Sequence, residues 1–298
     1  MVLQATRIAI VGLAFVVLKS GAPDEIDSAS QLPPGALKKL HSPDPQVRVA
    51  AAESLGRRGP KAASAAGALC TAALDPVDTV RAAALSALAK VDPPLHASVS
   101  KVLKEADPER CLAAIRAIGD MKEKGKAALP ILLFVEHLRE VLVPERTPGI
   151  GPTAHGSEGQ RLPSPVAAGA ARAVAASGLA GFKTLTETML SVASDDKLVT
   201  QQLAAWMLAA RNTEKRRFLA EAIIRTKHRA DAVPALIAAC RSEPEANVGT
   251  QVALIRALGA IGPAAKKAAP LLERARRYPS PEVREAAADA LDMIKGQP

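Results

Sequence analysis

The chain repeats one pattern of apolar and polar positions. A turn that contains Pro is followed by Val, by small apolar residues and then by a Leu or Ile. In the first copy, Val47, Ala51 and Leu55 lie four residues apart, which places them on one face of a helix. Gly56 and Gly59 then end that helix. We expect every copy to contain a first helix, a tight turn and a second helix that doubles back.

The last apolar residue of the first helix recurs at a nearly constant interval. These terminal residues are Leu55, Leu88, Ile118, Leu258 and Leu291. The steps from 55 to 88, from 88 to 118 and from 258 to 291 are 33, 30 and 33 residues. A period of this length is typical of stacked helical hairpins, each of which buries its apolar face only against its neighbours. The sequence therefore predicts an all-α fold, an α-solenoid of stacked antiparallel helix pairs.

A proline recurs near the start of the second helix and indicates the phase of the repeat. Pro130, Pro234 and Pro270 each follow a pair of apolar residues, of which the first is Ala. Proline is costly in the middle of a helix and costs little in the first turn. We therefore expect a second helix to begin just before each of these prolines.

The repeats fall into two blocks. Residues 36–142 contain the N-terminal repeats, residues 143–165 are rich in Pro and Gly and are predicted to be a disordered loop, and residues 166–298 contain the C-terminal repeats. In the second block we expect residues 166–177 and 180–194 to form one hairpin. The three helical segments that follow leave one segment extra, so the pairing between residues 197 and 242 stays open.

The N-terminus differs in composition from the repeats. Arg7 precedes an apolar run over residues 8–18, which is too short to span a bilayer comfortably and suits a secretory signal. We interpret residues 1–22 as a signal peptide or an N-terminal anchor and residues 23–35 as a linker. A cleaved signal implies export to a periplasmic or extracellular compartment. An uncleaved segment implies a membrane anchor, and an ordinary helix implies a cytoplasmic protein.

Composition limits the chemistry of the interior. The chain is 48% hydrophobic but only 2% aromatic, so the core must be built from Leu, Ile, Val and Ala. Cys70, Cys111 and Cys240 lie far apart among apolar residues and form no CxxC pair. This spacing predicts neither a zinc site nor a disulfide framework, and we expect the three cysteines to pack as small core residues.

The repeats resemble those of the HEAT family and of the armadillo-like superhelices, and specifically the short bacterial repeats of phycobilisome-lyase-like proteins. The phrases Asp44-Pro45-Gln46-Val47-Arg48 and Ser280-Pro281-Glu282-Val283-Arg284 carry this resemblance. It implies a ladder of first-helix Asp and Arg side chains between neighbouring repeats. By resemblance the ladder residues are Asp44, Arg48, Asp75, Arg81 and Arg284. Cys111 stands near the Arg position of the third repeat, where we expect the ladder to break.

The sequence offers no residue pattern for catalysis. The five histidines are not spaced as metal ligands, and the His-Glu dipeptides of HEAT-like di-iron hydroxylases are missing, since Glu136-His137 has the reversed order. No catalytic residue, metal ligand or cofactor is therefore assigned. A lyase-like or glycosylase-like enzyme remains an alternative, although aromatic residues are scarce and Trp206, which a glycosylase-like groove would use, lies on an apolar stretch predicted to be core.

One cluster of charge stands out as a candidate binding site. The chain carries a formal charge of +9, and residues 211–229 hold seven basic against two acidic side chains. The basic members, which we treat as candidate partner-binding residues, are Arg211, Lys215, Arg216, Arg217, Arg225, Lys227 and Arg229. Such a cluster attracts phosphates or acidic protein surfaces.

The function predicted from these patterns is a non-catalytic scaffold for protein–protein interaction. Second helices are expected to contact the partner, with contributions from Lys101, Lys104, Lys126, Lys266, Lys267 and Arg274. The alternative is binding of nucleic acid or another polyanion through residues 211–229, which export disfavours. Contact with a membrane is expected only through an uncleaved N-terminal segment, and the partner and the oligomeric state stay open.

Overall fold

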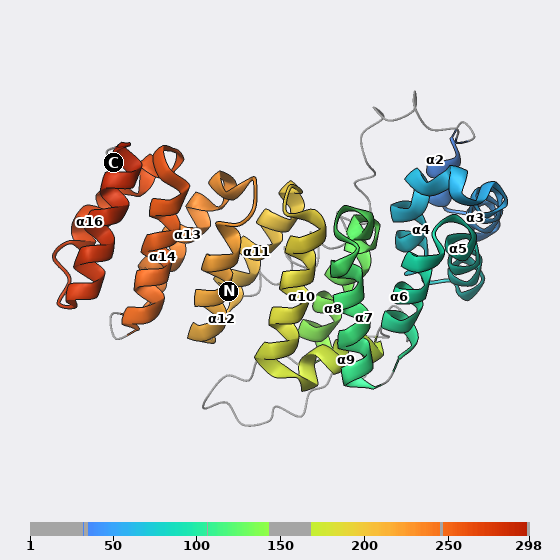
Figure 1. The fold of residues 1–298 in the computed structure, drawn as a ribbon, viewed down its shortest axis with the longest axis horizontal. Coiled ribbons are helices and arrows are strands. Elements are labelled where there is room, and N and C mark those ends of the chain that lie inside the picture. The colour runs from blue at the N-terminus through green and yellow to red at the C-terminus, as the bar shows by residue number, and fades with distance from the viewer. Residues whose placement is uncertain (1–31, 33–34, 106, 143–167, 245–246, 297–298) are drawn as a thin grey trace. The chain divides into compact units, whose positions relative to one another are not determined.

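The computed structural model describes residues 32, 35–105, 107–142, 168–244 and 247–296. These residues form α-helices and short 3-10 helices joined by turns, and no strand occurs among them (Figure 1). Contacts divide the chain into two compact units, Met1–Val192 and Ala193–Pro298. The predicted all-α fold of stacked helices is confirmed. The predicted signal peptide over 1–22, most of the linker over 23–35 and the loop over 143–165 lie outside the described residues.

The first helices of the N-terminal unit begin where the sequence places a Pro turn. They are α3 (Pro45–Arg58), α5 (Asp78–Val91) and α7 (Pro108–Asp120), and the short helix α2 (Ala36–Leu40) precedes them. The Asp44 carboxylate caps α3 by accepting the Gln46 N–H at 2.8 Å. Proline at the first helical position needs no hydrogen-bond partner, so an acid–Pro pair starts a helix efficiently.

The second helices begin as 3-10 turns or directly as α-helices. In the N-terminal unit they are η1 (Gly59–Ala65) with α4 (Ala66–Ala72), α6 (Pro93–Lys104), and η2 (Lys122–Ala128) with α8 (Leu129–Leu142). Two of the turns before them contain a left-handed residue. Gly59 has φ 57°, and Lys122 takes the equivalent place with φ 51°. Lys122 is the one non-Gly residue with positive φ among those described.

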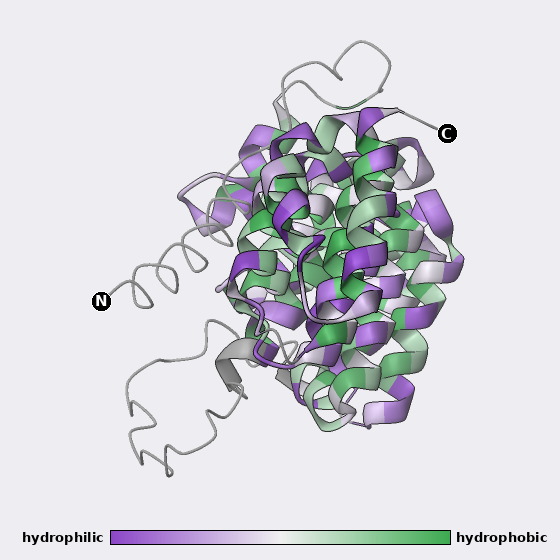
Figure 2. Cartoon of the chain, turned by 90° about the vertical axis from the view of Figure 1, so that its left-hand side faces the viewer, coloured by the Kyte–Doolittle hydropathy of each residue, from purple (hydrophilic) through white to green (hydrophobic). Residues whose placement is uncertain are grey.

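The core consists of apolar stripes shared between adjacent helices. The terminal anchors Leu55, Leu88, Ile118 and Leu258 are fully buried and Leu291 is 2% exposed, which confirms the positions predicted for them. They lie in separate layers of the stack. Figure 2 shows hydrophobic and hydrophilic stretches alternating around the helices, as expected of amphipathic helices that each cover a neighbour.

The helix α10 (Gly178–Ala193) takes the place of a first helix, which corrects the expected pairing of residues 166–177 with 180–194. The Thr188 and Ser191 hydroxyls on α10 donate to the carbonyls of Ile115 and Gly119 on α7, at 3.3 Å and 2.8 Å. α10 therefore meets α7 as α5 meets α3. α9 (Ala168–Ala176), which packs against α6, α7 and α8, is the extra helix.

The C-terminal unit resolves the pairing that the sequence left open. Its first helices are α12 (Thr213–Ile223), α14 (Val248–Ile261) and α16 (Pro281–Lys295). Its second helices are α11 (Lys197–Ala209), η3 (Arg229–Ala232) with α13 (Val233–Ser242), and η4 (Gly262–Ala268) with α15 (Ala269–Ala275). α11 packs against α13, and α12 packs against α14, so α11 is a second helix and α12 is a first helix.

One stretch of the described chain, Val248–Ala275, has the length and hydropathy of a membrane-spanning helix. It is the hairpin of α14, η4 and α15 rather than one straight helix, because Gly262 between the two arms has φ 73°. Its apolar residues pack on α13 and α16. We therefore interpret it as a repeat of the stack.

Candidate binding surface

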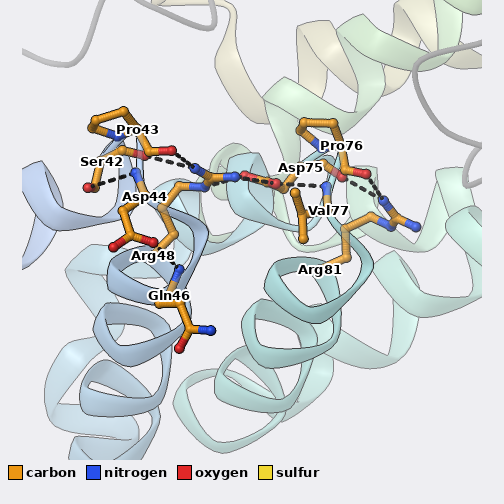
Figure 3. Close-up of polar contacts among 9 residues, drawn as sticks. All are labelled: Ser42, Pro43, Asp44, Gln46, Arg48, Asp75, Pro76, Val77 and Arg81. Carbon is orange, nitrogen blue, oxygen red and sulfur yellow. Dashed lines mark hydrogen bonds and ion pairs between the residues drawn. The ribbon is translucent and has the colours of Figure 1, made fainter.

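A bidentate ion pair joins the first two repeats (Figure 3). The Arg48 Nε and Nη2 atoms donate to the two Asp75 carboxylate oxygens at 2.8 Å and 2.9 Å. The Arg48 Nη1 donates to the carbonyls of Ser42 and Pro43 in the turn before its own helix, at 2.8 Å and 3.2 Å. Both side chains are 11% exposed, so this contact holds two turns in register in a dry environment.

The expected ladder of Asp and Arg side chains breaks before the third repeat, where Cys111 stands near the Arg position. Arg81 donates to the carbonyls of Asp75 and Pro76, as Arg48 does to those of its own turn. Its ion pair, however, is with Asp78 on its own helix. Arg284 also holds its turn, through the carbonyls of Tyr278 and Pro279.

The Arg48–Asp75 pair is one rung of the ladder, that is, an arginine and an acid from two successive turns. The C-terminal unit contains a second rung that the sequence interpretation missed. The Arg216 Nη1 donates to the Glu243 carboxylate, and Arg216 Nη2 donates to the Ala210 carbonyl. Arg216 and Glu243 are 27 residues apart, as are Arg48 and Asp75. The signal was present, since Glu243-Pro244 repeats the acid–Pro pair of Asp75-Pro76 at that distance.

This rung divides the predicted basic cluster. Lys215 is 6% exposed and the Arg216 side chain 15% exposed, so both lie inside the stack rather than on its surface. The five exposed members are Arg211, Arg217, Arg225, Lys227 and Arg229. Arg211 precedes α12, whereas three of the others follow it. A helix of 11 residues is about 16 Å long, so the cluster does not form one patch.

A second set of cations lies on the second helices of the same unit. It consists of the exposed side chains of Arg241, Lys266, Lys267, Arg274 and Arg277, which we call the second-helix cations. Within the described residues none of them makes an ion pair. The acids of these helices are already engaged, because Asp231 pairs with Lys197 at 3.3 Å and Glu273 with Arg276 at 3.5 Å. The surface therefore carries uncompensated positive charge.

The second helices of the N-terminal unit offer less charge. Lys101 and Lys104 on α6 are exposed, and Lys126 in η2 is half-buried. The nearby Glu136–Arg139 pair on α8 is buried, with N–O distances of 2.7 Å and 2.6 Å, and the Arg139 guanidinium lies 5.8 Å from the Phe182 ring centre. The charges of this pair are therefore neutralised inside the unit.

Burial dominates the ionisation of the cysteines and of two histidines in the described part of the chain. Burial raises the pKa of Cys70 and Cys240 to about 12 and that of Cys111 to about 11. All three thiols are free and buried, which confirms the interpretation as core residues. Burial lowers the pKa of both His137 and His96. The positive charge of nearby Lys104 lowers the pKa of His96 further. Within the described residues no three His, Cys, Asp or Glu side chains gather as a metal site.

A shallow groove of about 540 Å³ lies between α3 and α5. Its floor is formed where Gly56 approaches Ala87, and Glu53, Arg57 and Lys90 stand on its rim. The lining is mostly small side chains on two first helices that pack closely. This groove is a consequence of the close helix packing.

Comparison with known proteins follows the repeats. A family-wide sequence profile described as HEAT repeats matches residues 33–106 and 207–292, which together make up more than half of the chain. The chain belongs to the HEAT repeat family. Both matched HEAT regions contain an Arg–carboxylate rung, Arg48–Asp75 in the first and Arg216–Glu243 in the second.

Two further comparisons add little to this assignment. Among solved structures, the crystal structure of an engineered protein is 18% identical, with a TM-score of 0.37 over 88% of this chain and 95% of that chain. The curated proteins contain no match.

Proposed function

We propose that this HEAT repeat scaffold binds an acidic segment of a protein partner through the second helices of its C-terminal unit. The observation that carries the proposal is the set of second-helix cations, whose own acids are taken by Lys197 and Arg276. Stacked repeats present a continuous row of second helices, which suits an elongated ligand. No catalytic site is identified in the described residues.

The strength of such binding follows from the charges. An exposed ion pair contributes about 0.2 to 1 kcal/mol, so five cations provide at best roughly 5 kcal/mol, which is an affinity close to millimolar unless apolar contacts add to them. Exposed pairs are screened at a Debye length of about 8 Å in physiological salt. Binding should therefore weaken markedly as salt rises.

Charge reversal tests the proposal. The probe is a fluorescein-labelled oligoglutamate peptide, and its binding is followed by fluorescence anisotropy at low and physiological salt. The double variant Arg274→Glu/Arg277→Glu should weaken binding by up to about thirtyfold, since each exposed pair contributes up to about 1 kcal/mol. The control Arg256→Glu/Lys295→Glu changes the net charge equally, on exposed first-helix positions, and should have little effect.

Two results would contradict the proposal. If both double variants weaken binding equally, the peptide responds only to net charge. If the wild-type protein does not bind the peptide at low salt, the second-helix surface is not an anion-binding surface.

Binding of nucleic acid through the exposed part of residues 211–229 is the second candidate. Arg217 is 53% exposed and its nearest acid, Glu221, is 3.7 Å away and itself exposed, so Arg217 can reach a phosphate. Duplex DNA of random sequence should bind the wild-type protein more tightly than the Arg217→Glu/Lys227→Glu variant. If the duplex binds more weakly than oligoglutamate, the protein partner is favoured.

The enzymatic alternatives and the relation to phycobilisome-lyase-like repeats are supported only by resemblance. A glycosylase-like role needs an aromatic side chain in an open groove, whereas Trp206 is 3% exposed. Its interior position agrees with the prediction that it is core. The finer family assignment and a bacterial origin remain hypotheses that rest on the short repeats.

Export remains a proposal that rests on the apolar run at residues 8–18. It implies a partner in the periplasmic or extracellular space and disfavours nucleic acid. N-terminal sequencing of the mature protein from its native host tests it. A mature chain that begins near residue 23 would support a cleaved signal, and an intact Met1 would exclude one.

A further inference from the structure

The second helices of the C-terminal unit present their exposed residues in a common register. Leu203 on α11, Leu236 on α13 and Leu272 on α15 are fully buried and occupy equivalent positions. Two and five residues after each of them come positions that are half-buried or exposed. On α11 and α13 the two positions lie side by side on the helix surface because they are three residues apart, whereas after α15 the second position lies in the turn that follows the helix. The pairs are Ala205 with Leu208, Ala238 with Arg241, and Arg274 with Arg277.

The chemistry of these pairs changes along the stack. α11 presents two apolar side chains, α13 one apolar and one cationic, and α15 two cations. Leu208 is 48% exposed and is one of three large apolar side chains that are exposed in the described chain. α13 contacts both α11 and the start of the α15 arm, η4, so the three pairs are successive. The pairs therefore change from apolar on α11 to cationic at α15.

The spacing of the helices determines which ligand conformation matches this surface. Packed helices lie about 8–10 Å apart. A polyproline-II segment rises about 3.1 Å per residue and has three residues per turn, so it presents the same face about every 9.3 Å. Every third residue of such a segment meets the next helix. A β-strand presents one face about every 6.6 Å and falls out of register.

We propose that the α11–α13–α15 surface recognises an extended protein segment in which one bulky apolar residue is followed or preceded, at three-residue intervals, by two acidic residues. The apolar residue packs on Leu208, the first acid binds Arg241, and the second binds Arg274 and Arg277. The three-residue interval follows from matching the helix spacing to the polyproline-II rise. This proposal rests on the proposed function and adds a sequence register to it.

Three labelled peptides of identical composition test the register. Each contains one Leu and two Glu in a background of Pro and Ser. The first places Leu, Glu and Glu at three-residue intervals, the second has the reverse order, and the third places the three residues next to each other. One of the two spaced peptides should bind the wild-type protein at least about fivefold more tightly than the clustered peptide, as expected for one additional contact.

Two protein variants connect the preference to the surface. Leu208→Ser should reduce the affinity for the preferred spaced peptide and leave that for oligoglutamate unchanged, because oligoglutamate has no apolar residue. The control Leu37→Ser removes another exposed leucine, 40% exposed, from the N-terminal unit and should change neither affinity. Arg241→Glu should reduce the affinity for both the preferred spaced peptide and oligoglutamate.

The outcomes separate the register from the proposed function. If the clustered peptide binds as tightly as both spaced peptides, the register is wrong, and the proposed function stands as long as Arg274→Glu/Arg277→Glu weakens all of them. If Leu208→Ser has no effect on the preferred peptide, the apolar contact is wrong. If no peptide binds at low salt, both proposals fail.

Discussion

At the residue scale, an arginine and an acid decide how two repeats are joined. Arg48 reaches the turn of its own repeat with Nη1 and the acid of the next repeat with its other two nitrogens. Arg216 likewise joins two turns, since its Nη1 donates to the Glu243 carboxylate and its Nη2 to the Ala210 carbonyl. Both acids are followed by Pro and therefore start or precede a helix, which fixes their carboxylates relative to the arginine. The rung thus depends on side chains that come from two successive turns.

The Arg48–Asp75 rung should contribute substantially to stability. Asp75→Ala leaves the nearly buried Arg48 guanidinium without its counter-charge, and we expect a loss of about 3 kcal/mol in the free energy of unfolding in urea. Glu53→Ala is the control, because Glu53 also pairs with an arginine, Arg57, but both side chains are exposed, at 57% and 69%. It should cost less than about 1 kcal/mol. Equal losses for the two variants would show that the rung has no special role.

The buried cysteines should make stability fall at alkaline pH. Their folded-state pKa values, about 11 to 12, lie above the ordinary 9.0 of the unfolded chain. The folded protein therefore retains protons that the unfolded chain releases, and the stabilisation present below pH 9 is lost as pH rises. We expect a loss of about 1 kcal/mol per thiol between pH 8 and pH 10. Urea unfolding at both pH values measures this, and a variant with alanine at all three positions should lose less.

At the element scale, the face that each first helix turns to the next one determines whether the stack continues. In α14 this face contains Val252 and Gly259, and the glycine allows α16 to approach closely. The equivalent positions of α16, 33 residues later, hold Glu285 and Asp292, and both are exposed. A charged side chain at the glycine position prevents close packing. α16 therefore has the polar outer face of a capping helix.

Giving α16 the residues that α14 has on the equivalent face should allow a further helix to pack against α16. The double variant Glu285→Val/Asp292→Gly gives α16 an apolar face that accepts another helix, so we expect concentration-dependent self-association. Light scattering coupled to size-exclusion chromatography measures it. The control Glu214→Val/Glu221→Gly also replaces one acid by Val and one by Gly, on exposed positions of α12, and should leave the mass unchanged. A variant that keeps the mass of the wild-type protein would contradict the capping role.

At the scale of the whole molecule, each described unit buries its apolar surface only between neighbouring helices. The effect of a mutation should therefore remain local, in contrast to a protein with one central core. The most numerous contacts of α16 are with α14, and those of α5 are with α3. Damage at the first pair should leave the second unaffected.

Gly259→Ala tests this locality by hydrogen exchange. A Cβ at Gly259 would lie 2.9 Å from the Ala290 Cα, so α14 and α16 must separate, at a cost of about 1–3 kcal/mol. Exchange should accelerate in α14 and α16 and stay unchanged in α3 and α5. Gly249→Ala in the same helix has its nearest neighbour at 3.9 Å and should slow exchange or leave it unchanged. Faster exchange throughout the chain would indicate a single cooperative core.

Which features of the fold can be predicted from the sequence depends on how far along the chain each signal extends. The buried anchors, the Pro turns and the core cysteines follow from local periodicity, and all were predicted. The sequence places Arg216 in a surface cluster and not in a rung with Glu243, because a run of basic residues on one helix indicates charge but not orientation. α9 was assigned as a first helix, since a short Ala-rich helix has the same local pattern in either role.

The sequence by itself determined the all-α repeat architecture, because the period of about 33 residues and the terminal anchors are properties of one helix and its turn. Only the tertiary structure decided which helices pair and which charges face solvent. Pairing depends on close approach between residues distant in sequence, as between Gly119 and Thr188. The orientation of a charge depends on which neighbour covers it, and for Arg216 that neighbour lies 27 residues away.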